Sequence, residues 1–319
     1  METLFIMLKN VIIFVLLAVP GYLMVKGKLL TPKDSGALSK LLTNVGMPAL
    51  ILSSTVGLDL SGEFAVSLLA MAVVCIVFTV VMFVTSAWLC AGEKNEKTNG
   101  MMRFCAVFVN SGFIGIPLAN AVFPGNTTLM AYLIVSNIVM NVMMFTLGAY
   151  LISGDKSAIN IKKAVLTPVF LAFLAGIVLN LLKATTAVPE INTYANHLKG
   201  IVTPLSMTVL GMKLADVPMK RLFTSGRMYY VSFLRLVLYP VIGVALMLVL
   251  QKISVLSFGA DAVLGFFVGF AMPTAGLASA FSDQYNGDTD HAVILTLGTT
   301  IVSVATIPVL YWLLTLIVK

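Results

Sequence analysis

Long apolar stretches follow one another along almost the whole chain, and only short polar connections separate them. A helix needs about 20 apolar residues to cross the hydrocarbon core of a bilayer. Ten stretches come close to that length, at 4–27, 36–57, 64–91, 101–123, 127–152, 163–183, 197–215, 228–250, 258–281 and 291–317. These ten spans predict an all-α membrane protein. No connection is long enough to hold a soluble domain, so we expect residues 1–319 to form a single membrane unit.

Composition and charge narrow the class of protein. Hydrophobic residues make up 59% of the chain and charged residues 10%, whereas a soluble domain carries roughly a quarter charged residues. The net charge of +7 is spread along the chain without a dense basic block, so we expect membrane lipid and not nucleic acid as a partner. The three cysteines show no metal-binding or disulfide spacing, and we predict no metal site.

Positive charge predicts how the spans are oriented. Most basic residues lie in or beside the loops after spans one, three, five and seven: Lys26, Lys28, Lys33, Lys40, Lys94, Lys97, Arg103, Lys156, Lys162, Lys163, Lys213, Lys220, Arg221 and Arg227. Cytoplasmic loops of membrane proteins carry such an excess. We therefore predict a multi-pass protein of the inner or plasma membrane, with both termini on the non-cytoplasmic side.

The two halves of the chain resemble each other when they are divided near residue 157. Spans two and seven align through Pro48 and Pro204, and spans four and nine both carry a centre interrupted by glycine and proline. Each half has five spans, so the halves must enter the membrane from opposite sides. The sequence predicts two inverted five-helix repeats, and in secondary transporters paired interrupted spans of this kind mark the binding site.

The interrupted centres read NSGFIGIP in span four and MPTAG in span nine. Proline removes a backbone donor and glycine leaves helical dihedrals easily, so we expect breaks between Asn110 and Pro117 and between Met272 and Gly276. Unpaired backbone is tolerated at membrane depth only under protein or in a water-filled cavity. Two broken helices that cross each other meet this condition, and their amide ends suit a carboxylate. A simple proline kink in each helix is the alternative.

Polar side chains near these breaks are further candidates. Asn137 and Asn141 are four residues apart and share a helix face, and Asn44 precedes Pro48 in span two. Thr274 can bond a freed carbonyl or a ligand. For all of them, hydrogen bonding that joins the helices of a bundle is the alternative.

Ionisable residues are rare inside the spans. No Asp or Glu lies at a span centre, so no proton relay is evident, and we interpret Asp283 as a solvated loop charge. Arg235 lies about seven residues into span eight, and we expect its guanidinium to extend to the cytoplasmic interface; attraction of an anionic substrate is the alternative. No nucleophile–base pair or catalytic motif appears, so we do not expect an enzyme.

Three motifs are shared with a known family. NSGFIGIPLANAVFPGN resembles the fourth-helix motif of the auxin efflux carrier family, AMPTAGLASAFSDQYNGDTDHA is similar to its ninth-helix motif, and TNVGMPALIL is similar to its second. The family includes plant PIN proteins and bacterial permeases labelled for malate or malonate. The resemblance spans the whole chain, without the long central loop of the plant members.

The resemblance implies ten helices arranged as in bile-acid symporter-like and sodium/proton antiporter-like folds, with helices four and nine crossing at Pro117 and Pro273. In plant members an asparagine at the position of Asn110 contacts the substrate carboxylate, and a polar amide lies near the position of Asn137. After the ninth-helix proline this chain has TAG, where plant members favour a longer polar side chain, which argues against auxin itself. A homodimer through the second and seventh helices is a further implication.

We therefore expect a secondary transporter for a small organic anion such as a carboxylate. An elevator-like motion would carry a crossover domain, 64–152 and 228–317, against a scaffold, 1–57 and 163–215. The anion is expected to contact Asn44, Asn110, Ser111, Gly112, Gly115, Pro117, Asn137, Asn141, Met272, Pro273 and Thr274. No cofactor is predicted, and a coupling proton or sodium ion stays open. The alternatives are a channel-like facilitator of the same fold and an intramembrane enzyme.

Overall fold

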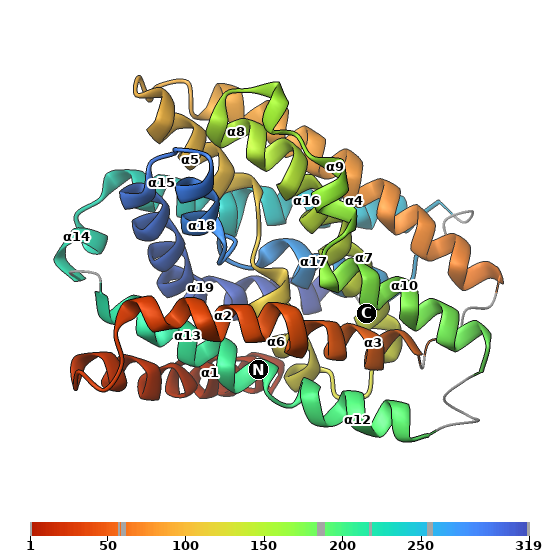
Figure 1. Ribbon diagram of the computed structural model, residues 1–319. Helices are drawn as coiled ribbons and strands as arrows, with labels where there is room; N and C mark the ends of the chain where they lie inside the picture. The colour runs from red at the N-terminus through yellow and green to blue at the C-terminus, as the bar shows by residue number, and fades with distance from the viewer. Residues whose placement is uncertain are drawn as a thin grey trace.

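The computed structural model describes residues 2–56, 58, 62–183, 189–216, 219–253 and 258–317 (Figure 1). Over these ranges the regular elements are helices, and the one extended pairing is an isolated antiparallel bridge between Val109 and Thr274. The all-helical prediction is therefore confirmed. Residue 57, which ends the first predicted scaffold range, lies outside the described residues.

Five helical segments of the described chain are long and apolar enough to cross a membrane: Leu8–Lys26, Gly62–Leu89, Thr127–Ser153, Gly226–Leu250 and Thr289–Ile317. They coincide with predicted spans one, three, five, eight and ten. Spans one, three and ten are the single helices α1 (Glu2–Lys26), α4 (Gly62–Leu89) and α19 (Thr289–Ile317). Span five runs through α7 (Thr127–Met143), η4 (Met144–Gly148) and α8 (Ala149–Ser153), and span eight through α15 (Gly226–Phe233), η6 (Leu234–Leu238) and α16 (Tyr239–Leu250).

The other spans are divided into shorter helices. Span two comprises α2 (Ser35–Leu41), η2 (Leu42–Gly46) and α3 (Met47–Val56), after the short turn η1 (Pro32–Asp34). Span four comprises α5 (Glu96–Val107), η3 (Ser111–Gly115) and α6 (Ile116–Val122). Spans six and seven comprise α9 (Ile161–Val165), α10 (Pro168–Leu181), α12 (Glu190–Lys199) and α13 (Val202–Asp216), and span nine comprises α17 (Ala260–Ala271) and α18 (Ala278–Gln284). The short elements η5 (Lys156–Ala158) and α14 (Met219–Phe223) lie in connections.

Prolines explain most of the π-helical turns. Of the four π turns in the described residues, three end two positions before a proline: η2 before Pro48, η3 before Pro117 and η6 before Pro240. A proline lacks the N–H that an α-helix uses, and its ring crowds the carbonyl four residues earlier. A π turn shifts the hydrogen bonds ahead of the proline to more distant acceptors and so relieves the crowding. At these three positions a π turn precedes the proline, and the helix continues beyond the proline.

The helices form two groups that pack on each other (Figure 1). In one group α1 lies against α13, and α3 lies against α10 and α12. In the other, α7 contacts both α4 and α17, and α19 contacts α5, α15 and α18. The groups meet where α1 contacts α19 and α6, and where α3 contacts α7. The first group contains the spans predicted as a scaffold, and whether the two groups move as domains stays a prediction.

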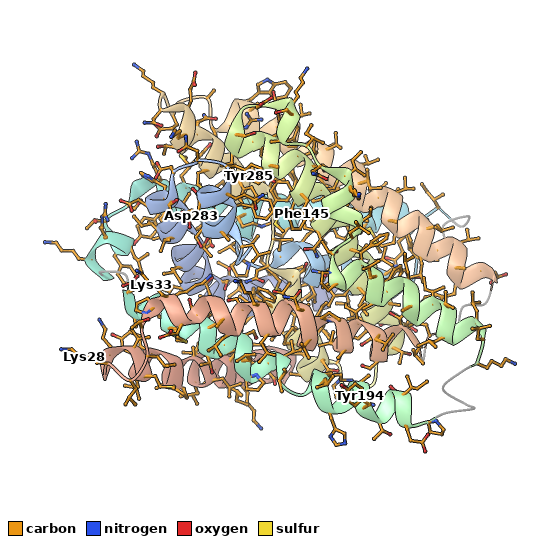
Figure 2. All side chains as sticks on the ribbon, in the orientation of Figure 1. Lys28, Lys33, Phe145, Tyr194, Asp283 and Tyr285 are labelled. Carbon is orange, nitrogen blue, oxygen red and sulfur yellow. The ribbon has the colours of Figure 1, made fainter. Side chains whose placement is uncertain are left out.

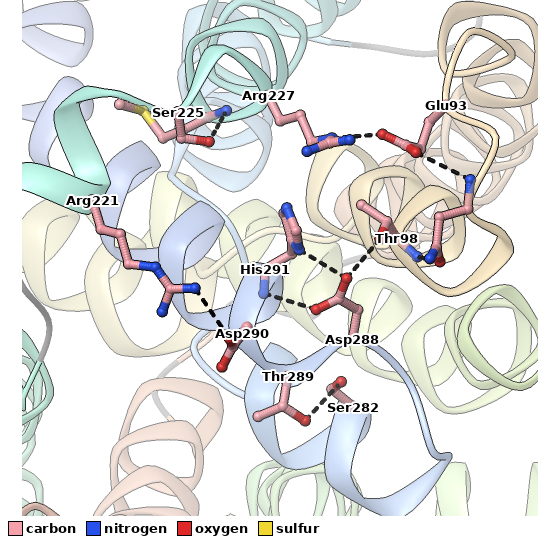
Figure 3. Close-up of polar contacts among 12 residues, drawn as sticks. Glu93, Thr98, Arg221, Ser225, Arg227, Ser282, Asp288, Thr289, Asp290 and His291 are labelled. Carbon is pink, nitrogen blue, oxygen red and sulfur yellow. Dashed lines mark hydrogen bonds and ion pairs between the residues drawn. The ribbon is translucent and has the colours of Figure 1, made fainter.

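Polar contacts join several helix ends (Figure 3). Arg227 pairs with Glu93, and Asp288 accepts hydrogen bonds from the Thr98 hydroxyl at 2.6 Å and the His291 N–H at 3.1 Å. These bonds connect the starts of α5, α15 and α19. Partial burial raises the pKa of Asp288, but the hydrogen bonds from Thr98 and His291 outweigh burial and hold this pKa below its usual value.

Candidate functional site

Spans four and nine are both interrupted, and the interrupted stretches cross each other. The Asn110 N–H donates to the Pro273 carbonyl at 2.8 Å, and the Ala275 N–H donates to the Phe108 carbonyl at 2.9 Å. The two bonds flank the antiparallel bridge between Val109 and Thr274. The two main chains therefore satisfy each other's polar groups in a buried region, as non-helical backbone at membrane depth requires.

The interruptions lie only partly where the sequence predicts them. In span nine, Met272 to Gly276 are non-helical, which confirms the prediction. In span four the predicted range, Asn110 to Pro117, consists mostly of η3 and the start of α6, and the extended backbone lies earlier, at Phe108 and Val109. Pro117 lies in the first turn of α6, where a missing N–H is tolerated. The expected crossing at the two prolines is therefore wrong for Pro117, although Pro273 does carry one of the crossing bonds.

A fully buried arginine caps the C-terminal carbonyl groups of α5 and α17, the helices that precede the two interruptions. Such ends lack partners inside their own helix. From η6, Arg235 donates through Nη1 to the carbonyls of Ala106, at 3.3 Å, and Val107, at 2.9 Å, and through Nη2 to the carbonyl of Phe270. Its positive charge also lies at the negative ends of two helix dipoles. The expectation that this side chain extends to the cytoplasmic interface is therefore wrong, because the ends of α5 and α17 supply its acceptors.

The hydroxyl of Thr274 bonds a freed carbonyl, which is one of the two roles that the sequence suggests for it. Its Oγ1 donates to the carbonyl of Cys105 at 2.8 Å, and its N–H donates to Thr299 Oγ1 at 3.2 Å. Thr274 is fully buried. Its hydroxyl therefore supports the freed backbone at the end of α5.

The two amides of span five do share a face and are bonded to each other. Asn141 Nδ2 donates to the Asn137 carbonyl at 2.8 Å and to Asn137 Oδ1 at 3.1 Å. Asn137 Nδ2 in turn donates to Ser111 Oγ at 2.8 Å. This chain of hydrogen bonds connects α7 to η3 and holds the Asn137 side chain in one orientation.

A pocket of about 60 Å³ lies beside the crossing, and four predicted residues line it: Asn110, Gly112, Asn137 and Asn141. Asn110 Oδ1 accepts from the Phe113 N–H at 3.2 Å and so caps η3. In the described part of the chain, Asn110 Nδ2 has no hydrogen-bond acceptor. Gly112 must stay small here, because a Cβ would lie 3.1 Å from Met47 Cε and 3.2 Å from Asn137 Nδ2. The site therefore offers two amides whose donors are already bonded, Asn137 and Asn141, and one amide with free donors, Asn110.

The structure does not bring every predicted residue to this pocket. Ser111 lies behind it and holds Asn137, while the pocket lining lacks Gly115, Pro117, Met272, Pro273 and Thr274. Asn44 is exposed and donates to the carbonyl of Lys40, in its own span, at 2.8 Å. Asp283 is exposed as expected and accepts from the Thr289 hydroxyl at 2.7 Å.

The charge pattern groups Lys213 with the loop after span seven, although predicted span seven, 197–215, already contains it. The residue lies inside α13, and its Nζ donates to the carbonyl of Gly276, in the interrupted stretch of span nine, at 3.2 Å. Lys213 and Asn110 both line a second pocket, of about 40 Å³. Leu214 and Ala215 continue the apolar span beyond the lysine, and this continuation was the available signal.

Comparison with known proteins identifies the family. The family model described as "Membrane transport protein" matches residues 5–311. The chain is also 30% identical over 305 residues to an uncharacterized transporter of Methanothermobacter thermautotrophicus. This alignment covers 94% of this chain and 94% of that transporter. The matched region therefore includes both interrupted spans and the helices between them. The family and the long apolar helices identify a multi-pass membrane protein. The chain belongs to this family of membrane transport proteins, the auxin efflux carrier family that its motifs resemble.

Proposed function

We propose that this transporter carries a small organic anion, such as a carboxylate, by secondary transport. The observation that supports an anion is the Asn110 amide, whose Nδ2 has no acceptor in the described chain and which lines the pocket beside the crossing. An N–H donor suits a carboxylate oxygen. The described lining contains no Asp or Glu, the side chains that a site for a cationic substrate usually provides.

Asn110 and Asn137 have different roles in this proposal. The hydrogen bonds to Ser111 and from Asn141 fix the Asn137 amide, so it shapes the pocket wall. Asn110 is fixed through its oxygen only, which leaves its nitrogen free to donate to the anion. A donor held in place before binding costs less conformational entropy when the ligand arrives.

The proposed motion is elevator-like, with spans three to five and eight to ten moving against spans one, two, six and seven. The pocket supports this because its lining comes from both groups: Thr43, Met47 and Val169 from spans two and six, and the remaining residues from spans four, five and nine. A site at the boundary between two helix groups can change the side to which it opens when the groups shift. We further propose that both termini lie on the non-cytoplasmic side.

Uptake into proteoliposomes tests the function. Wild-type protein should take up at least one carboxylate from a labelled panel, with saturation and with counterflow from preloaded vesicles. Asn110→Ala should lower the transport efficiency, Vmax/KM, at least about tenfold, since a hydrogen bond to a charged group contributes about 1.5–3 kcal/mol. The matched control is Asn196→Ala, an exposed asparagine on α12, which should transport as wild type does.

Two results would contradict the proposal. Equal Vmax/KM for Asn110→Ala and wild type, for every transported carboxylate, would remove Asn110 from the site. Currents of high unitary rate without counterflow would show a channel with this fold.

A further inference from the structure

We propose that Lys213 binds the carboxylate of the transported anion, and that its ammonium passes from the Gly276 carbonyl to the anion when the anion enters. The inference rests on the proposed function, because it assigns a second residue, with a full positive charge, to the same anion. It concerns the second pocket, which shares Asn110 and Gly276 with the pocket of Asn137 and Asn141.

Lys213 is a half-buried cation without an acidic partner. The described residues form three ion pairs, Arg221–Asp290, Arg227–Glu93 and His291–Asp288, and Lys213 takes part in none of them. Among the described residues, its polar contact is the hydrogen bond that Nζ donates to the Gly276 carbonyl. An ammonium has three donors, so this contact leaves donor capacity for a ligand.

The cavities place this ammonium beside Asn110. Gly276 lines the pocket of Asn137 and also the second pocket, which Lys213 and Asn110 share. A Cβ on Gly276 would lie 3.1 Å from Asn110 Nδ2, so the Asn110 amide lies directly against this glycine. The Gly276 carbonyl thus accepts from Lys213, while the space beside the Gly276 Cα is occupied by the Asn110 amide. One anion of a few atoms can meet both donors in this arrangement.

Lys213 also lines a third pocket, of about 110 Å³, which offers a route to the second one. Lys213, Gly276, Thr296 and Leu297 line both pockets. Asp216, one turn further along α13, lies at the third pocket, is exposed and forms no ion pair with Lys213. The ammonium is therefore the positive charge that an anion meets on this route before it reaches Asn110.

The chemistry favours the exchange of partners. A charge-assisted hydrogen bond between an ammonium and a carboxylate is roughly twice as strong as one between neutral groups. The four-carbon stem of a lysine lets the ammonium turn from one acceptor to another. Without an anion, the Gly276 carbonyl satisfies one donor of the ammonium; with an anion, the carboxylate neutralises its charge.

A role limited to supporting the Gly276 carbonyl is the competing explanation, and one substitution separates the two. Lys213→Gln keeps an N–H donor for the carbonyl but removes the charge. If Lys213 binds the anion, the KM of this variant for a carboxylate that wild type transports should rise at least about tenfold, while Vmax changes by less than about threefold. Lys213→Arg keeps the charge and should stay closer to wild type. Lys220→Gln, an exposed lysine of α14, is the matched control and should leave KM unchanged.

A second measurement tests whether the positive charge of Lys213 contributes to binding. Wild type should be inhibited more strongly by the acid form of a substrate than by its neutral amide, and Lys213→Gln should lose most of this preference. Should Lys213→Gln fail to fold, Lys213→Cys serves instead, because an aminoethyl methanethiosulfonate reagent can restore the charge in folded protein. The native cysteines, Cys75, Cys90 and Cys105, are buried, and the reagent-treated wild type is the control. Treatment should lower the KM of the variant toward the wild-type value.

The outcomes distinguish this inference from the proposed function. If wild type transports carboxylates while Lys213→Gln keeps the wild-type KM and the preference for acid over amide, Lys213 is a structural residue and only the inference fails. The same holds if restoring the charge on Lys213→Cys leaves its KM unchanged. If wild type transports no carboxylate, the proposed function itself fails, and the inference fails with it.

Discussion

Arg235 is the residue that most directly allows two helices to stop inside this protein. The carbonyls of Ala106, Val107 and Phe270 lie at buried helix ends, where water cannot reach them. One guanidinium, with several donors in a fixed plane, serves all three. A lysine has a smaller charged group and cannot reproduce this geometry, so the residue type matters as well as the charge.

Removing this guanidinium should destabilise the protein. Arg235→Met leaves three buried carbonyls unpaired, and each unsatisfied buried group costs about 1–3 kcal/mol, so we expect a loss of about 3 kcal/mol or more. Unfolding in detergent can be followed with a thiol-reactive dye, since Cys75, Cys90 and Cys105 are buried until the protein opens. The control is Arg221→Met, whose side chain is 61% exposed and whose ion pair should contribute less than about 1 kcal/mol. Equal melting temperatures for the two variants would contradict this role of Arg235.

At the scale of helices, glycines bring the backbones of α1 and α13 into contact. A Cβ on Gly211 would overlap the backbone carbonyl of Ala18, and a Cβ on Gly21 would overlap that of Thr208. The two glycines therefore act reciprocally, one from each helix. Small residues at such crossings let helices approach closely, which membrane proteins need because lipid removes most of the hydrophobic drive for association.

Gly211→Ala should therefore separate α1 from α13. The new methyl group meets backbone, which cannot rotate away as a side chain can, so we expect a lower melting temperature and loss of transport. An alanine in open helical space is instead favourable, by up to about 1 kcal/mol. Gly36→Ala in α2, where nothing lies within 4 Å of the added Cβ, is the control and should melt at or above the wild-type temperature. A Gly211→Ala protein as stable as Gly36→Ala would show that the two helices can move apart without cost.

At the scale of the whole molecule, the connections after spans one and seven, both rich in basic residues, lie at the same end. Lys28 and Lys33 lie at the left of the view and Tyr194, on α12, lies toward the lower right (Figure 2). The short helix α14, with Lys220 and Arg221, also lies at the left (Figure 1). Basic loops at one end are what the positive-inside rule expects of a cytoplasmic face.

Reporter fusions test the proposed orientation. Alkaline phosphatase, which is active only outside the cytoplasm, should be active when fused to the C-terminus and inactive when fused after Lys156, in the connection between spans five and six. A green fluorescent protein should give the opposite pattern, because it becomes fluorescent in the cytoplasm. Phosphatase activity at Lys156 together with fluorescence at the C-terminus would reverse the orientation.

Five long apolar spans, the helical class, the interruption at Met272 to Gly276 and the family could all be predicted from the sequence alone. These features depend on neighbours in the chain: hydrophobic length sets a span, and proline or glycine acts on the turn beside it. The packing of distant segments, by contrast, turns Arg235 inward, extends span four at Val109 and brings Lys213 to Gly276. Arg235 and Ala106 are 129 residues apart, and such partners meet only when packing removes the water that would otherwise hydrogen-bond to each of them.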